Sequence, residues 1–403
     1  MVEIASAIET VAGFRAVGVH CGLKKDDRLD LAFIISETPC AAAGVFTTNL
    51  LKSAPVLINA EHLVRNSAGA RAVVINTGSA NACTGTQGMD NARLTAHYAA
   101  QRIGCATEDV LVLSTGVIGT HLPMDKICVG VDMASSATGS DWAAAARAIM
   151  TTDTRPKLAS ATVADAGGQY RIAGITKGAG MIAPNMATML AVIVTDAALN
   201  PAQAHAALTF AVDVSYNRIV VDGDMSPNDT VLLLANGASG VKPDMDAFQQ
   251  TLTALCTHLA QEIVRDGEGA TKFITLDIRR ASDDASARQI AHTIATSALV
   301  KTAFYGNDAN WGRIIAAAGR AGVPFDPSRA RLQMAAQLDG HEQTVLLFDA
   351  GMPTDYSETL ATAIISAAEV RVVLDCGLGS GAAIVWTCDL SHDYVTINGD
   401  YRT

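Results

Sequence analysis

The sequence lacks the features that define several large classes of protein. No apolar run is long enough to span a bilayer, and the first residues, MVEIASAIETVAGF, have neither the basic nor the apolar stretch of a secretory signal. We therefore expect a cytoplasmic protein without a membrane partner. The 29 Lys and Arg residues form no cluster and are outnumbered by 40 Asp and Glu. The resulting net charge of -11 disfavours a nucleic-acid partner, because phosphate binding requires a basic surface.

The spacing of the cysteines and histidines and the low aromatic content exclude further classes of protein. The eight cysteines show no CxxC spacing, so reduced thiols are expected rather than a disulfide framework. The nine histidines are dispersed without an HxxxH pair, so we expect no metal site. Aromatic residues make up only 5%, whereas 33 glycines and 49% hydrophobic residues indicate close packing of small side chains. This composition favours an enzyme with a small-molecule substrate.

Length and apolar periodicity indicate a mixed α/β protein with two domains. A chain of 403 residues exceeds the size at which one core stops growing. Apolar runs typical of buried strands lie at 72–76, 110–114, 189–196, 230–236, 273–278 and 370–375. Helical patterns lie at 91–103, 141–150, 201–213, 245–264, 283–303 and 358–368. Apolar strands with helices between them predict layered sheets covered by helices. A polar stretch at 280–286 predicts a main domain at 1–280 and a smaller C-terminal lobe at 281–403.

Two motifs imitate known binding loops. The stretch 370–383, VRVVLDCGLGSGAA, has GxGxG spacing and no helix after it, so a glycine hairpin between two strands is predicted rather than a phosphate loop. The stretch 222–230, DGDMSPNDT, resembles part of a calcium loop but lacks the closing glutamate. For this stretch we predict a polar turn beside the site.

The segment KGAGMIAPNMATML, at 177–190, places Thr188 behind small residues and ahead of an apolar strand. A threonine freed at its amino side carries its own base, which activates the hydroxyl as a nucleophile. That requires a cut between Ala187 and Thr188, and the glycines and proline of the segment leave its backbone accessible and stiff. Taken alone, the segment favours the alternative in which Thr188 only caps a glycine-rich loop.

The segment LSTGVIG, at 113–119, brings a hydroxyl and an unhindered amide together at Thr115 and Gly116. Such a pair can form an oxyanion hole, whose donors stabilise the tetrahedral intermediate of acyl transfer. The alternative is a plain turn after a strand, stabilised by hydroxyl side chains. These residues alone favour the alternative.

Read in order along nearly the whole chain, these segments resemble the ornithine acetyltransferase family, also called glutamate N-acetyltransferase. The matching strings begin with GVHCGLKKDDRLDLAFIISETPCAAAGVFTTNLLKSAPV and continue through NTGSANACTG, LSTGVIG, MTTDT and KGAGMIAPNMATML. They end with NRIVVDGDMSPNDT, GEGATKF, AFYGNDANWGRIIAAAGRAG and VTINGDYRT. The resemblance implies an α/β/β/α sandwich with a smaller C-terminal α/β lobe.

The resemblance also assigns roles to residues. It implies self-cleavage between Ala187 and Thr188, giving an α chain of 1–187 and a β chain that starts at Thr188, the nucleophile. Thr115 and Gly116 match the family's oxyanion hole. The substrate-contacting positions match Thr151, Lys177, Thr188, Glu268, Asn398 and Thr403.

The activity that the resemblance implies is acetyl transfer from N-acetylornithine to glutamate through an acetyl-threonine. No cofactor is implied. Some members also use acetyl-CoA as co-substrate, and no phosphate-binding loop in this sequence decides that point. The family assembles its α and β chains into heterotetramers or larger particles. Departures from its pattern at Gly399 and Pro227 put the substrate range in doubt but leave the acyl chemistry intact.

Two other functions remain open at this stage. An amidase or aminopeptidase with the same nucleophile would hand the acyl group to water, and would hydrolyse N-acetylornithine without transfer to glutamate. A non-catalytic binding protein would stay as one uncut chain.

Overall fold

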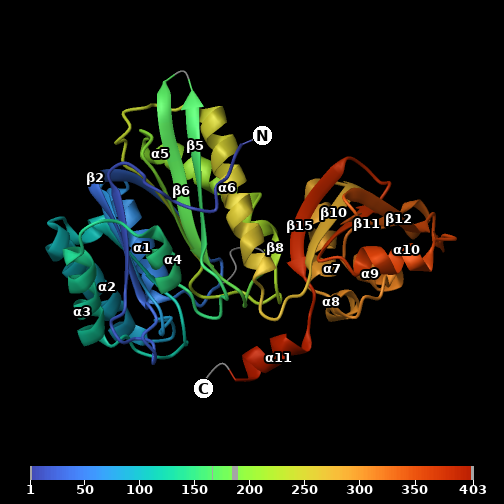
Figure 1. The fold of residues 1–403 in the computed structure, drawn as a ribbon, viewed down its shortest axis with the longest axis horizontal. Helices are drawn as coiled ribbons and strands as arrows, with labels where there is room; N and C mark the ends of the chain where they lie inside the picture. Colours follow the sequence, from blue (N-terminus) through green and yellow to red (C-terminus); the bar gives the residue numbers. More distant parts are fainter. Residues whose placement is uncertain (1, 166, 184–188, 401–403) are drawn as a thin grey trace. The chain divides into compact units, whose positions relative to one another are not determined.

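The computed structural model describes residues 2–165, 167–183 and 189–400, which form two compact units (Figure 1). The first unit comprises Met1–Met181, Asn185–Asn217 and Met225–Ile263. The second comprises Ile182–Pro184, Arg218–Asp224 and Val264–Thr403. The mixed α/β class and the smaller C-terminal lobe are confirmed. The chain makes its last passage from the first unit to the second between Ile263 and Val264, near the end of α6 (Met245–Arg265), so the strand that contains residue 280 belongs to the second unit.

The first unit contains the strands β1 (Phe14–Val19), β2 (Leu31–Phe46), β3 (Ala70–Asn76), β4 (Val110–Ser114), β5 (Lys157–Asp165), β6 (Gly168–Lys177), β7 (Leu190–Thr195) and β9 (Thr230–Ala235). Its helices are α1 (Ala54–Asn66), α2 (Gly85–Ile103), α3 (Met124–Ser136), α4 (Trp142–Ala148), α5 (Pro201–Asp213) and most of α6 (Met245–Arg265). The strand order is β4-β3-β2-β9-β7-β6-β5, with β1 paired to β2. The predicted strands at β3, β4, β7 and β9 are confirmed.

Strand β2 belongs to two halves of this sheet. Its first part pairs with β1 and β3, with Leu31 opposite Asn76, and its last part pairs with β9, with Phe46 opposite Thr230. Between these parts the residues 37–39 are exposed, and the register with β3 shifts. Pro39 within this stretch has no amide to donate to a ladder, which favours a break in pairing. The two halves therefore stack as the layers of a sandwich.

Alternation of side chains along the strands gives each half-sheet two apolar faces. In β4, Leu111 and Leu113 enter the core between the two half-sheets, whereas Val110 and Val112 face α1, α2 and α3. Helix α5 packs on β2 and β9, and an added Cβ at Gly174 of β6 would lie 3.2 Å from the side chain of Leu259 in α6. The layers are therefore α/β/β/α, as the family resemblance implies.

The second unit has one sheet, with the strand order β13-β12-β11-β14-β10-β15-β8. The strands are β8 (Ile219–Val220), β10 (Phe273–Ala281), β11 (Arg331–Leu338), β12 (His341–Asp349), β13 (Met352–Pro353), β14 (Glu369–Asp375) and β15 (Gly381–Cys388). The helices are α7 (Asp284–Ala295), α8 (Ala298–Tyr305), α9 (Trp311–Gly319), α10 (Glu358–Ile365) and α11 (His392–Gly399). One apolar core joins the sheet to α7, α8, α9 and α10.

The glycine hairpin predicted at 370–383 is wrong. Strands β14 and β15 both pair with β10, which lies between them, so the glycine loop passes over the end of β10. Close contacts explain its glycines: an added Cβ at Gly379 would lie 2.7 Å from the carbonyl oxygen of Ala281, and one at Gly381 would lie 2.1 Å from the carbonyl carbon of Asp283. The predicted helix at 283–303 is also divided into α7 and α8, which are separated at Thr296 and Ser297.

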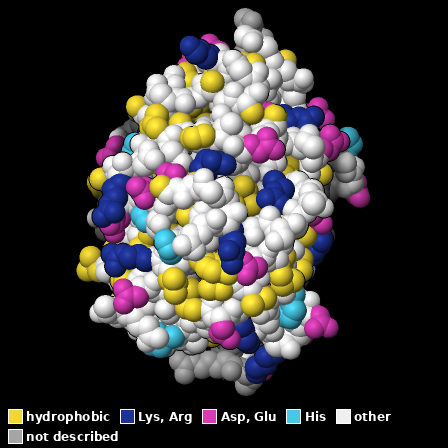
Figure 2. All heavy atoms as spheres, turned by 90° about the vertical axis from the view of Figure 1, so that its left-hand side faces the viewer, with side chains coloured by type: hydrophobic (Ala, Val, Ile, Leu, Met, Phe, Trp, Pro, Cys, Tyr) yellow, Lys and Arg dark blue, Asp and Glu magenta, His cyan; other side chains and the backbone are white. Residues whose placement is uncertain are grey.

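Charges of both signs are interspersed on the face turned toward the left of Figure 1, as Figure 2 shows.

All eight cysteines are free thiols, four of them buried, and Cys83 is exposed. No helix in the described part of the chain has the length and apolarity needed to cross a membrane.

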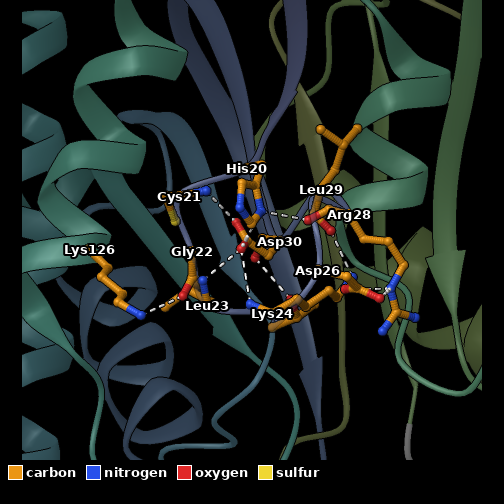
Figure 3. A network of polar contacts seen from close by, with 11 residues as sticks. His20, Cys21, Gly22, Leu23, Lys24, Asp26, Arg28, Leu29, Asp30 and Lys126 are labelled. Atoms are coloured by element: carbon orange, nitrogen blue, oxygen red, sulfur yellow. Dashed lines mark hydrogen bonds and ion pairs between the residues drawn. The ribbon is translucent and has the colours of Figure 1, made fainter.

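A buried carboxylate organises the loop between β1 and β2 (Figure 3). Asp30 is inaccessible to solvent and accepts hydrogen bonds from the backbone amides of Cys21 and Leu23, both at 2.7 Å, and of Lys24 at 3.1 Å. Burial tends to raise the pKa of Asp30, but these donors outweigh burial and lower it. The loop therefore folds around one ionised side chain.

Replacing Asp30 by Ala removes this acceptor, and we expect a loss of about 2–4 kcal/mol in the free energy of unfolding, because buried amides are left unpaired. Urea unfolding measures the change. Asp26→Ala in the same loop is the control: its carboxylate pairs with Arg28 in solvent, so little or no change in the free energy of unfolding is expected. Equal losses in the two variants would contradict the assignment.

Candidate active site

The ends of four strands meet at one end of the sandwich. Ser114 ends β4, Lys177 ends β6, and Leu190 and Thr230 begin β7 and β9. Asn228, two residues before β9, links the start of β9 to the end of β4 and the loop after β3, because its Nδ2 donates to the carbonyl oxygens of Ala80 at 2.7 Å and Ser114 at 2.8 Å. Lys177 is also the register partner of Leu190, so both ends of the loop 178–189 lie here.

Thr115 and Gly116 follow β4 at this place. Thr115 is buried, and its amide donates to the carbonyl oxygen of Asn76 at 3.0 Å. Gly116 has a φ of +133°, and an added Cβ would lie only 2.4 Å from the carbonyl carbon of Gly78. Only glycine fits this close approach of two backbones. The sequence pair therefore sits in a rigid, tightly packed turn.

The Thr115 hydroxyl lies next to a buried cation. Lys177 is 3% exposed, and its Nζ donates to Thr115 Oγ1 at 3.4 Å. Because the hydroxyl accepts from the lysine, its own proton remains for another acceptor. The pair can thus present both a hydroxyl donor and a positive charge to an oxygen that gains negative charge.

Asp153 holds the surroundings of Lys177 together. Its Oδ1 accepts from Lys157 Nζ at 2.7 Å and from the Gly178 amide at 2.8 Å, and its Oδ2 accepts from the Thr151 amide at 3.0 Å. The side chains of Asp153 and Lys157 are both fully buried. This one carboxylate therefore fixes the backbone at Thr151, a predicted substrate position, and at Gly178, which follows a second predicted position, Lys177.

The pKa of Asp153 is lowered to about 2. Burial alone would raise it, but the charges of Lys177 and Lys157, together with the Gly178 amide, outweigh burial. One carboxylate thus faces two lysines, Lys157 and Lys177. Lysine ammonium groups are suited to an anionic group of a substrate.

Two further predicted substrate residues meet in the second unit. Asn398, in α11, donates through Nδ2 to Glu268 Oε2 at 2.7 Å and to the Tyr394 carbonyl oxygen at 3.0 Å. The Tyr394 hydroxyl donates to Asp222 Oδ2 at 3.2 Å, and Asp222 Oδ1 accepts from the Ile182 amide at 2.8 Å. Burial, followed by the negative charge of Asp222, raises the pKa of Tyr394. This cluster is acidic and can bind a cationic group.

Three predicted residues, Ala187, Thr188 and Thr403, lie outside the described residues. Among the residues that the structure describes, no group of three His, Cys, Asp or Glu side chains could hold a metal ion. Sequence reasoning assigned no role to Asp153 or Asn228. Both lie in segments that resemble the family, MTTDT and DGDMSPNDT, but the sequence of these segments does not show that the two side chains connect separate strands.

Comparisons with known proteins agree on one family. The model of the ArgJ family matches residues 15–403. The arginine biosynthesis bifunctional protein ArgJ of Thermotoga neapolitana is 48% identical, over 97% of this chain and 99% of its own. Its counterpart from Geobacter sulfurreducens is 48% identical, over 98% and 100% respectively. Ornithine acetyltransferase of Mycobacterium tuberculosis, solved with ornithine, is 39% identical with a TM-score of 0.42, covering 46% of this chain and 98% of that chain.

The depressed pKa of Asp153 predicts how stability depends on pH. A carboxyl whose pKa is lower in the folded than in the unfolded chain stabilises the fold above its unfolded pKa, about 4. This contribution is lost as the pH falls toward about 2. Asp153→Asn, which leaves two buried lysines without the charge, should therefore be about 3–5 kcal/mol less stable at neutral pH.

Urea unfolding of both chains between about pH 6 and pH 2.5 measures this difference. We expect it to shrink below about pH 4, because the Asp153 carboxyl of the unfolded original chain then takes up a proton that the folded chain binds only near pH 2. A difference that stays constant to the acid end would contradict the ion cluster.

Proposed function

The chain belongs to the ArgJ family, and from this premise we propose that it transfers an acetyl group from N2-acetyl-L-ornithine to L-glutamate. The observation that supports this most directly is the buried group of Thr115, Lys177 and Asp153. It lies where the loop 178–189 leaves β6 and enters β7, so the loop that contains Thr188 begins and ends at donors suited to an oxyanion.

Self-cleavage prepares the nucleophile. The Thr188 hydroxyl oxygen attacks the carbonyl carbon of Ala187, the peptide C–N bond breaks, and the hydroxyl proton passes to the departing nitrogen. Water then hydrolyses the ester, which leaves an Ala187 carboxylate and a Thr188 with a free amine and a free hydroxyl. The freed amine is the base that the hydroxyl needs.

Acetyl transfer follows in two halves. The amine takes the hydroxyl proton as Thr188 Oγ bonds to the acetyl carbon, and the Thr115 hydroxyl and Gly116 amide stabilise the oxyanion. The acetyl C–N bond breaks, ornithine leaves with the proton, and an acetyl ester remains. The amine of glutamate then attacks the ester, N-acetylglutamate forms, and the Thr188 hydroxyl recovers its proton.

The substrate groups match the charges of the two clusters. Lys177 and Thr151 bind the α-carboxylate that both amino acids share, because an ammonium and a hydroxyl both donate hydrogen bonds to a carboxylate. Glu268 and Asn398 bind the distal ammonium of ornithine, and Thr403 completes the substrate contacts. The α and β chains, 1–187 and 188–403, assemble as a heterotetramer or a larger particle.

The amidase alternative uses the same nucleophile and differs only in the acceptor. With N-acetylornithine and glutamate both present, transfer yields N-acetylglutamate, whereas hydrolysis yields acetate. Release of acetate without N-acetylglutamate would support the amidase. Acetyl-CoA in place of N-acetylornithine tests the second donor in the same assay.

Replacing Thr188 by Ala removes the nucleophile for both reactions, so we expect one uncut and inactive chain. Intact mass spectrometry before and after brief incubation with N-acetylornithine measures the cut and the acetyl adduct together. The original chain should give two fragments, with acetyl on the fragment that begins at Thr188. A Thr188→Ala chain that is cut and active would refute the assignment.

Replacing Thr115 by Val removes the hydroxyl but keeps the β-branched shape of this buried side chain. We expect kcat to fall roughly 100- to 1,000-fold, the usual cost of one oxyanion donor. Thr115→Ser keeps the hydroxyl and is the matched control, with kcat within about tenfold of the original chain. Steady-state kinetics with N-acetylornithine separate the two, and a Val variant as active as the Ser variant would exclude the hydroxyl from this role.

A further inference from the structure

Asp389 joins two segments of the second unit that carry predicted substrate residues. It directly follows β15, is 3% exposed, and its Oδ1 accepts hydrogen bonds from the backbone amides of Thr271 at 2.8 Å and Lys272 at 2.9 Å. Its Oδ2 accepts from the Thr271 hydroxyl at 2.6 Å. All three donors lie a few residues after Glu268. One buried side chain therefore ties the chain that leaves β15 to the segment that carries Glu268.

A second contact ties the turn around Glu268 to the start of α11. A backbone hydrogen bond of 2.9 Å across residues 267–270 closes this turn, with Glu268 inside it. The carbonyl oxygen of Gly269 accepts from the Ser391 hydroxyl at 2.6 Å. Gly269 has a φ of +69°, and an added Cβ would lie 2.6 Å from the Tyr394 amide nitrogen. The turn thus lies against the first residues of α11 as closely as glycine allows.

Lys301 of α8 holds the same chain segment before α11. It is 3% exposed, and its Nζ donates to the carbonyl oxygen of Cys388 and, at 3.2 Å, to the hydroxyl of Thr387. The carbonyl oxygen of Lys301 accepts from the Leu390 amide at 3.3 Å. Successive residues from 388 to 391 are therefore anchored alternately to Lys301 and to the segment 267–272.

Helix α11 depends on this base because it has little packing of its own. None of its residues, His392–Gly399, all of which the structure describes, is buried, and Val395 is 69% exposed. In Figure 1 the helix lies away from the sheet of the second unit. A helix of this length is marginal in water without tertiary packing. The position of Asn398 relative to Glu268 is therefore set mainly by polar contacts at the base of α11.

We propose that Asp389 is a positioning residue for recognition of the distal ammonium of ornithine. Its hydrogen bonds to the segment after Glu268 keep that carboxylate beside Asn398, whose Nδ2 donates to Glu268 Oε2 at 2.7 Å. The pair then offers carboxylate and amide oxygens, which are the acceptors that an ammonium requires. The inference rests on the proposed function, in which N-acetylornithine is the acetyl donor.

Comparing N-acetylornithine with N-acetylnorvaline tests the proposal, because norvaline is ornithine without the distal ammonium. The ratio of kcat/KM for the two donors, with glutamate as acceptor, measures recognition of the ammonium. We expect Asp389→Ala to lower this ratio roughly tenfold to a hundredfold, the value of a hydrogen bond to a charged group. Asp389→Asn keeps an oxygen that can accept from both backbone amides, so its ratio should stay within about threefold of that of the original chain.

Asp277→Ala is the matched control. Asp277 is another buried aspartate of the second unit, in β10, and its carboxylate accepts from Arg279 Nε at 3.0 Å. Its removal should leave the ratio unchanged. An Asp389→Ala chain that is less stable but keeps the original ratio would show a purely structural role and overturn the proposal. An Asn variant whose ratio falls as far as that of the Ala variant would overturn it too.

If Asp389→Ala does not fold, Thr271→Val decides the matter. Thr271 is exposed, and this change removes only the hydroxyl that donates to Asp389 Oδ2, while both backbone amides remain. The ratio should fall in the same direction by a smaller amount, about twofold to tenfold. An unchanged ratio in this variant would overturn the proposal.

Failure of the proposed function has a different signature. An original chain that transfers no acetyl group from N-acetylornithine to glutamate would remove the reaction itself, and this inference would fall with it. An original chain that is active but uses both donors equally well would keep the reaction and remove only the role of Asp389 in recognising the ammonium.

Discussion

The site depends on the bend within β2, which takes this strand from one half-sheet into the other. A single strand enters one half-sheet at Leu31 and leaves the other at Phe46, and both of these ends lie at the same end of the sandwich. As a result, the carboxyl end of β4 meets the carboxyl end of β6 and the amino ends of β7 and β9. Neither half-sheet alone carries both the Thr115 turn and Lys177.

In the first unit, the pKa of each buried aspartate depends on the hydrogen-bond donors and charges that lie beside it. Asp153 is ionised because two lysines and several backbone amides compensate for its burial. Asp229, just before β9, is also buried and accepts a hydrogen bond from the Met189 amide at 3.1 Å, but burial outweighs this donor, Thr47 and the charge of Lys177 and raises its pKa. Both aspartates are buried, so their different partners explain why the pKa of Asp153 is lowered and that of Asp229 is raised. A pair of carboxyls with such different environments is a common basis for dividing roles within an active site.

The sequence predicts the elements whose pattern is strong and local. The apolar runs at β3, β4, β7, β9, β10 and β14 appear as strands, and Asn200 followed by Pro201 begins α5 as expected. The predicted strands do not include β2, which carries polar residues at its bend. The glycine loop was misjudged for a related reason: local spacing suggests a hairpin, but a distant strand, β10, lies between the two arms.

The residues of the candidate site also divide into those that the sequence indicates and those that only the folded structure reveals. Thr115, Gly116, Thr151 and Lys177 stand out through the family resemblance, and the structure gathers them in the first unit. Asp153, Asn228 and Asp229 act by hydrogen bonds to backbone groups up to 148 positions away in the sequence. Such contacts have no periodicity, so they become visible only once the strands are in place.

The strand order has a consequence for a chain cut before residue 188. Strands β7 and β9 would belong to the second fragment, yet they lie between β2 and β6 of the first. Each fragment alone would expose open sheet edges and half of a core, whereas together they form one uninterrupted ladder. The cut would thus divide the covalent chain without dividing the folded body, and the fragments would separate only when the whole sheet unfolds.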